Sequence, residues 1–207
     1  VFSGATGAPL FVFLGDEPFD DLGHALDGAG DVDGDGVPDV IAGLHDNPDP
    51  GQARVYSGAD GVLLLQLDGS SVGDFFGHAV TGAGDVDGDG RGDVLVGASR
   101  DDTVGTDAGI VHLLSGADGS VLRSWTGGAA HDEFGLWVAD AGDFDGDGRG
   151  DHVLSNPGDD VPGRNAGSAR VVSGADGLTL ATLPGVPQGL RFDVVAVGPR
   201  GLEHLED

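Results

Sequence analysis

The sequence predicts an all-β protein, a β-propeller built from four-stranded antiparallel blades. Glycine or proline interrupts the chain so often that its longest stretch without either covers only eight residues, 190–197, whereas helices in globular proteins usually run to about ten residues or more. A unit of 54 to 58 residues recurs along the chain, and periods of this order are typical of propellers and solenoids. Apolar residues make up 39% of the 207 residues, which is enough to bury a core.

Two markers define the repeat. The window D-x-D-G-D-G-x-x-D begins at Asp31, Asp85 and Asp143. The turn sequence S-G-A-[DT]-G begins at Ser3, Ser57, Ser115 and Ser173. The two markers alternate along the chain, so they predict one domain over residues 1–207 with repeats at about 16–69, 70–127 and 128–185.

Each repeat contains four short apolar runs, separated by turn signals and in the same order. The first run begins with an aromatic-Gly or Leu-Gly pair and covers 22–27, 76–81 and 134–140. The second follows the aspartate window, at 40–43, 94–98 and 152–155, and the third follows a variable loop, at 53–56, 110–114 and 169–172. The S-G-A-D-G turn precedes the fourth, at 62–67, 121–125 and 178–183. Four short antiparallel strands per repeat are the make-up of a propeller blade.

The second repeat carries a family resemblance. Phe76-Gly77, the loop from Asp85 to Asp93 and Val96-Gly97-Ala98 follow in an order that resembles the FG-GAP repeats of integrin α-subunit propellers and bacterial surface proteins. The resemblance covers roughly residues 16–185. It departs at Leu22-Gly23, where leucine replaces the aromatic residue, and at Ser155-Asn156-Pro157, which replaces Gly-Ala. These departures concern local packing in the first and third repeats rather than the aspartate loops.

The two ends of the chain match the end and the beginning of a repeat. Leu10–Leu14 follows a turn marker as a fourth strand would, and Phe192–Val197 matches a first strand. A propeller commonly closes by building one blade from both termini. We therefore expect residues 1–15 and 186–207 to form a composite fourth blade without a metal loop, in a monomer. The alternatives are a partial or larger propeller, of which this chain is a piece, and a ring shared by a dimer.

The aspartate windows have the composition of calcium sites. Calcium binds six to eight oxygen ligands in flexible geometry, and alternate positions of a coiled loop bring several carboxylates to one point. Positions 1, 3, 5 and 9 are aspartates, position 6 is a glycine that suits a turn with positive φ, and position 7 would contribute a backbone carbonyl. The predicted ligands are Asp31, Asp33, Asp35, Val37 and Asp39; Asp85, Asp87, Asp89, Arg91 and Asp93; and Asp143, Asp145, Asp147, Arg149 and Asp151. We expect three calcium ions per chain, at nearly independent sites.

Other interpretations of these windows are weaker. An EF-hand requires glutamate at position 12, where this chain has Ala42, Val96 and Leu154. Simple hairpin turns need one or two acids, and four converging carboxylates would repel one another without a cation. Magnesium prefers stricter octahedral geometry. The tripeptides Arg91-Gly92-Asp93 and Arg149-Gly150-Asp151 resemble an integrin ligand, but each aspartate is also a predicted metal ligand.

Charge and composition exclude several classes of function. The net charge is −27, from 36 acidic and 9 basic residues, which disfavours nucleic acid and anionic membrane surfaces as partners. The chain has no cysteine and no apolar run long enough for membrane insertion. It also lacks a repeat-breaking cluster of residues suited to acid–base chemistry, so we expect no enzymatic activity.

The predicted function is that of a calcium-stabilised extracellular or cell-surface module for binding or adhesion. The variable segments 45–52, 100–109 and 158–167 are the expected recognition loops for a protein or glycan partner, because they differ in length while the metal loops do not. The alternatives are a carbohydrate-binding lectin and a non-catalytic propeller of a larger enzyme that acts on polysaccharides or lipids.

Overall fold

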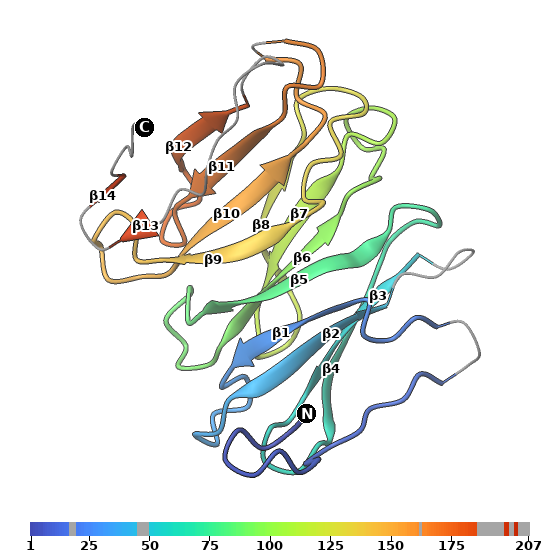
Figure 1. The fold of residues 1–207 in the computed structure, drawn as a ribbon, viewed down its shortest axis with the longest axis vertical. Helices are drawn as coiled ribbons and strands as arrows, with labels where there is room; N and C mark the ends of the chain where they lie inside the picture. The colour runs from blue at the N-terminus through green and yellow to red at the C-terminus, as the bar shows by residue number, and fades with distance from the viewer. Residues whose placement is uncertain (17–19, 45–49, 162, 186–196, 199–200, 203–207) are drawn as a thin grey trace.

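Three consecutive four-stranded antiparallel sheets form the fold. A computed structural model describes residues 1–16, 20–44, 50–161, 163–185, 197–198 and 201–202 (Figure 1). The first sheet comprises β1 (Ala25–Gly30), β2 (Asp39–Leu44), β3 (Gln52–Tyr56) and β4 (Leu63–Asp68). The second comprises β5 (Phe76–Gly84), β6 (Asp93–Ala98), β7 (Ile110–Leu114) and β8 (Val121–Thr126). The third comprises β9 (Val138–Gly142), β10 (Asp151–Asn156), β11 (Ser168–Val172) and β12 (Thr179–Pro184).

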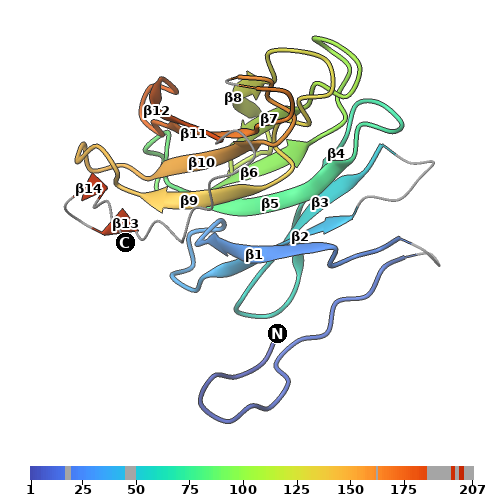
Figure 2. The ribbon, with the colours of Figure 1, turned by 45° about the horizontal axis from the view of Figure 1, so that its top comes forward.

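The sheets are arranged like the blades of a propeller. In each sheet the strands pair in sequence order, so the first strand lies at one edge and the fourth at the other. Figures 1 and 2 show the first strands β1, β5 and β9 side by side, with β1 against β5 and β5 against β9. The all-β fold of four-stranded antiparallel units is therefore confirmed. The described residues contain no helix long and apolar enough to cross a membrane.

The core lies between the blades. β6 is buried along its whole length, and the two-residue alternation of a strand sends its side chains to opposite faces. Val94 and Val96 therefore pack with the first blade, whereas Leu95 packs with Phe134 and Leu154 of the third. The apolar run predicted at 94–98 thus contributes to two cores, one on each face of the strand.

The glycine at the Phe-Gly position of one repeat meets the glycine at the Gly-Ala position of the repeat before it, across the interface between two blades. A Cβ on Gly97 would overlap the carbonyl oxygen of Gly135, and a Cβ on Gly43 would overlap that of Gly77. Gly77 and Gly135 have positive φ angles of 85° and 79°, a conformation that favours glycine. In the third blade Ser155 takes the place of Gly97, and its Oγ accepts a hydrogen bond of 2.8 Å from the Trp137 N–H.

The N-terminal segment packs where an outer strand was expected, but it is not a strand. Leu10–Leu14 forms no ladder in the described structure, yet the Phe13 ring stacks on Tyr56 with 4.1 Å between ring centroids. The Phe11 ring lies against Gly61, as Leu67 of β4 lies against Gly119 in the next blade.

The composite blade stays a prediction. Residues 192–196 of the expected first strand lie outside the described residues. Among the residues that the structure describes, the short strands β13 (Val197–Gly198) and β14 (Gly201–Leu202) pair with each other. The number of blades and the closure of the ring are therefore predictions, as is the division of the chain into repeats.

Candidate metal centres

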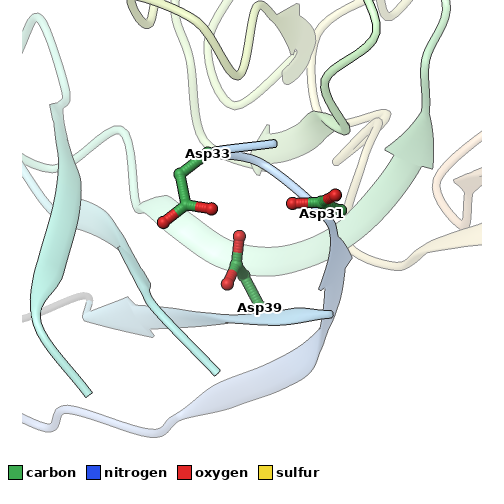
Figure 3. A group of neighbouring side chains, drawn as sticks. All are labelled: Asp31, Asp33 and Asp39. Atoms are coloured by element: carbon green, nitrogen blue, oxygen red, sulfur yellow. The ribbon is translucent and has the colours of Figure 1, made fainter. Parts of the chain in front are cut away.

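Each aspartate loop brings three carboxylates together. Within each group, one oxygen from each residue lies within 4.8 Å of the others. Figure 3 shows this convergence for Asp31, Asp33 and Asp39, which point toward a common centre. The equivalent groups are Asp85, Asp87 and Asp93 in the second loop and Asp143, Asp145 and Asp151 in the third. Positions 1, 3 and 9 of all three loops could therefore hold a metal ion.

The position-1 aspartate coils its own loop. Asp31 Oδ1 accepts hydrogen bonds from the backbone N–H groups of Gly34 and Asp35, at 2.8 and 3.0 Å, and Oδ2 accepts one from Gly36 at 2.9 Å. Gly34 and Gly36 have φ angles of 81° and 87°, which glycine adopts without the steric cost that a Cβ brings. A glycine was predicted to be needed at position 6, and the structure shows an equal need for one at position 4, which was not predicted.

The position-9 aspartate joins the two markers of the repeat. Asp39, Asp93 and Asp151 are at most 1% exposed. In the second loop, Asp93 Oδ2 accepts a hydrogen bond from Val86 N–H at 2.8 Å, and Oδ1 accepts one from Gly116 N–H at 3.0 Å. Gly116 is the first glycine of the S-G-A-D-G turn, and the first and third loops make the same pair of bonds. The turn and the loop therefore recur together because one carboxylate links them.

The position-5 aspartates lie apart from these groups. Asp35, Asp89 and Asp147 each accept a hydrogen bond through Oδ1 from the N–H of position 7, at 2.7 to 2.8 Å. They were predicted as ligands with the other nine aspartates, but the structure does not bring them into the three-carboxylate groups. Their role, and that of the position-7 carbonyls of Val37, Arg91 and Arg149, stays a prediction.

The electrostatics of the groups suit a hard cation. Burial raises the pKa of Asp93 and the negative charge of Asp87 adds to this, although the N–H groups of Gly116 and Val86 oppose it. The pKa of Asp145 is also raised, by lost hydration and then by the charges of neighbouring loop aspartates. A divalent ion among the carboxylates would reverse this repulsion. The donor atoms are all oxygens, which calcium and other hard cations prefer.

Arginines tie the second and third aspartate loops to the loop before each of them. Arg91 Nη1 donates to the carbonyl of Val32 at 3.0 Å, and Arg149 Nη1 donates to that of Val86. Gly92 N–H also donates to the Asp31 carbonyl at 2.7 Å. The three carboxylate groups have no residue in common, but neighbouring loops are directly bonded to each other. The signal in the sequence was arginine at position 7 of the second and third loops, where the first has Val37.

The Arg-Gly-Asp tripeptides are not displayed for recognition. Asp93 and Asp151 are buried at 0% exposure, and the guanidinium groups of Arg91 and Arg149 donate to the preceding loops. A ligand tripeptide would need both charges at the surface, so the structure supports the interpretation of these tripeptides as incidental.

Comparisons with known proteins agree with the repeat pattern. The model of the family described as "FG-GAP repeat" matches residues 76–114 and 136–172. Integrin alpha-PS2 of Drosophila melanogaster is 32% identical over 154 residues, which are 69% of this chain and 11% of that protein. Integrin alpha pat-2 of Caenorhabditis elegans is 38% identical over 105 residues, which are 46% of this chain and 8% of that protein. The chain thus spans about a tenth of the length of these relatives.

Among solved structures, a rhamnogalacturonan lyase of Bacillus licheniformis has a similar fold. The TM-score is 0.51 at 16% sequence identity, and the match covers 79% of this chain and 34% of the lyase chain. At that identity the likeness concerns the fold alone. The sequence matches show that this chain carries FG-GAP repeats and that integrin alpha subunits are among its relatives.

Proposed function

We propose that this chain is a calcium-stabilised extracellular module that binds a protein or glycan partner in adhesion and has no catalytic activity of its own. The observation that carries the proposal is the recurrence of one carboxylate group in three consecutive blades, in a chain with integrin alpha relatives. Extracellular calcium-binding modules work at dissociation constants of about 10⁻⁴ to 10⁻³ M, which loops of this size can provide.

Calcium is the cation that best suits the loops. It accepts irregular oxygen geometry, so a small rotation of the position-5 side chain and the carbonyl of position 7 could complete each site. When bound, the ion would supply positive charge at the place where the acidic loops repel themselves. Asp31 and its equivalents would hold the ion while keeping the loop coiled. Asp39 and its equivalents would connect it to the following turn.

Counting bound ions and measuring thermal stability test the calcium proposal. We expect three ions per chain by isothermal titration calorimetry or elemental analysis. Linkage predicts about 2.7 kcal/mol of stabilisation per site at free calcium ~100 times the dissociation constant. A chelator should therefore lower Tm, and magnesium at equal concentration should restore less of it. Fewer than two bound ions, or a Tm that the chelator leaves unchanged, would contradict the proposal.

The partner is proposed to bind through the variable loops. The loop over 100–109 is held in shape by hydrogen bonds from Gly109 N–H to the Asp101 carbonyl and from Asp107 N–H to Asp102 Oδ1. The loop over 158–167 has an equivalent bond, from Asn165 N–H to Asp160 Oδ1. Loops that are fixed at their bases can present different side chains on one scaffold.

Loop replacement tests this part of the proposal. Residues 103–106 would be replaced by a Gly-Ser linker of equal length, and wild type and variant would be compared on arrays of extracellular matrix proteins and of glycans. Binding that the replacement abolishes, with calcium binding intact, is the expected result. A glycan hit would identify the lectin alternative, and no binding on either array would count against recognition by loops.

A further inference from the structure

Two histidines lie close together where the first strands of the first and second blades run side by side. His24 stands directly before β1, and His78 is the third residue of β5. Figures 1 and 2 show these two strands next to each other. The ring centroids of the two histidines are 5.0 Å apart, and the rings are tilted by 44°. This histidine pair contains none of the residues of the aspartate loops.

The two histidines occupy the same position in consecutive repeats. Each follows the glycine that begins the first apolar run, and its backbone N–H donates to a carbonyl three residues earlier, that of Asp21 or Phe75, at 3.0 Å. The third repeat forms the same turn with Leu136. The turn therefore does not require an imidazole, and the backbone geometry does not account for two adjacent histidines.

The distance between the two rings fits a shared metal ion. Two imidazoles on one tetrahedral ion, each with about 2.0–2.1 Å between metal and nitrogen, have ring centroids roughly 5 Å apart. Imidazole nitrogens are ligands for zinc, copper and nickel, whereas calcium takes oxygen ligands. The histidine pair therefore differs in chemistry from the three aspartate loops.

Each ring also has the kind of partner that orients a metal-binding histidine. Asp21 Oδ2 faces His24 Nδ1 at 3.7 Å, and the backbone of Leu136 is a hydrogen-bond partner of the His78 side chain. A histidine that binds a metal through one ring nitrogen commonly donates the N–H of the other to a carboxylate or a backbone carbonyl. Both kinds of partner lie beside the histidine pair.

Exposure and charge suit a bound cation. The His24 side chain is 34% exposed and His78 is half-buried, so an ion can reach the pair from solvent. Burial, and then the proximity of His24, lower the pKa of His78, which keeps its ring in the neutral form that binds metals. Glu133 adds negative charge and Arg100 positive charge near His78, in a chain whose net charge of −27 attracts cations.

We propose that His24 and His78 bind one divalent transition metal ion of the zinc, copper and nickel class. Each histidine supplies one ring nitrogen, and water completes the coordination on the side open to solvent. The bound ion joins the first and second blades at the beginning of their first strands, whereas the aspartate loops follow the ends of the same strands. The inference does not rest on the proposed function, because it involves neither the calcium ligands nor the variable loops.

Titration calorimetry with Zn²⁺ in saturating calcium tests the site. We expect one Zn²⁺ per chain and a Tm that rises with Zn²⁺ concentration. His24→Leu and His78→Leu introduce the residue that the third repeat has at this position, and each should weaken Zn²⁺ binding by about tenfold or more. His131→Ala removes an exposed histidine outside the pair and should change the affinity by less than about twofold. No Zn²⁺ binding in saturating calcium, or equal affinities of wild type and either leucine variant, would overturn the assignment.

Trp137 provides a second readout, in which both histidines are kept. Its ring centroid is 6.3 Å from that of His78, and Trp125 in β8 is the other tryptophan of the chain. Bound Cu²⁺ should quench the fluorescence of Trp137, so Trp137→Phe should bind Cu²⁺ with little quenching. Electron paramagnetic resonance of the wild-type Cu²⁺ complex should show coupling to two imidazole nitrogens. Coupling to oxygen ligands alone, or equal quenching in wild type and Trp137→Phe, would reject the site. Calcium binding is counted separately, so these results are independent of the proposed function.

Discussion

At the scale of single residues, the position-9 aspartates have two roles. Asp93 is buried, closes its loop through Val86 N–H and holds the next turn through Gly116 N–H. Asp87, at position 3, is exposed, and its carboxyl accepts a short-range bond from Asp89 N–H. Both belong to the same carboxylate group, but only Asp93 also supports the fold. Substitutions at the two positions should therefore separate metal binding from stability.

We predict that Asp87→Ala removes the second metal site and leaves the stability of the metal-free protein within about 0.5 kcal/mol of wild type. Asp93→Asn should destabilise the metal-free protein by about 1–3 kcal/mol, because an amide NH₂ faces one of the two backbone N–H donors. Urea unfolding in excess chelator measures both effects. Equal stabilities of the two metal-free variants would show that the link from Asp93 to Val86 and Gly116 does not stabilise the fold.

Gly97 tests the close contact between blades. We predict that Gly97→Ala destabilises the domain by about 1–3 kcal/mol, because its Cβ would overlap the backbone of Gly135 and the blades would have to separate. Gly128→Ala is the matched control, since its Cβ would meet only Asp132 Oδ2, at an ordinary 3.6 Å. Thermal unfolding of both variants in calcium measures the difference, and a similar Tm for the two would contradict this account of the interface.

At the level of strands and loops, sequence patterns predicted the features that depend on residues close together in the chain. The third strand of the second repeat was predicted at 110–114, as observed for β7, because an apolar run lies between two clear turns. The first strand of the third repeat was predicted to begin at Phe134, but β9 begins at Val138. At this point of the third blade Ser155 stands in place of Gly97, and its Oγ accepts the Trp137 N–H just before β9 begins. The three carboxylate groups likewise followed from spacing within one loop.

Contacts between repeats could not be predicted in the same way. The arginine ties between loops and the glycine contacts at blade interfaces join residues more than 30 positions apart. They depend on how neighbouring sheets are oriented, and residue spacing within a repeat does not determine that orientation. The position-5 aspartates illustrate a smaller limit, because alternation along the loop did not reveal that their carboxylates bond to the backbone of position 7.

Arg91 tests whether neighbouring metal loops are coupled. We predict that Arg91→Ala lowers stability by about 1–2 kcal/mol, since the Val32 carbonyl of the first loop loses a charged donor. The same variant should weaken calcium binding at the first site while the third is unchanged. Arg164→Ala removes an exposed arginine and is the control. Calcium titration monitored by NMR resolves the loops separately, and an unchanged first site would support fully independent sites.

At the scale of the whole molecule, the question is what covers the two outer faces of the three-blade array. On one side, Phe11 and Phe13 pack on the first blade while Leu10, Val12 and Leu14 between and beside them are 56%, 75% and 76% exposed. On the other side, a hollow in the third blade is lined by Phe144, Val153, Val171 and Leu183. Side chains that are alternately packed and exposed are typical of an outer strand whose neighbouring strands are missing. The exposed side chains of the N-terminal segment and the hollow in the third blade therefore favour a further blade between them.

Closure within one chain leads to the last prediction. If the N-terminal segment serves as the outer strand of a fourth blade, Phe13→Ala should destabilise the whole domain by about 1–3 kcal/mol, whereas Phe2→Ala, at a residue 71% exposed, should have little effect. The protein should then sediment as a monomer of 20.6 kDa with a compact scattering profile. A stable dimer would instead indicate that the chain's exposed edges are covered by a second copy, because open edges and apolar faces of this kind promote association when no blade covers them. A dimer that separates into folded monomers on Leu10→Asp substitution, with Phe13→Ala silent, would reject closure within the chain.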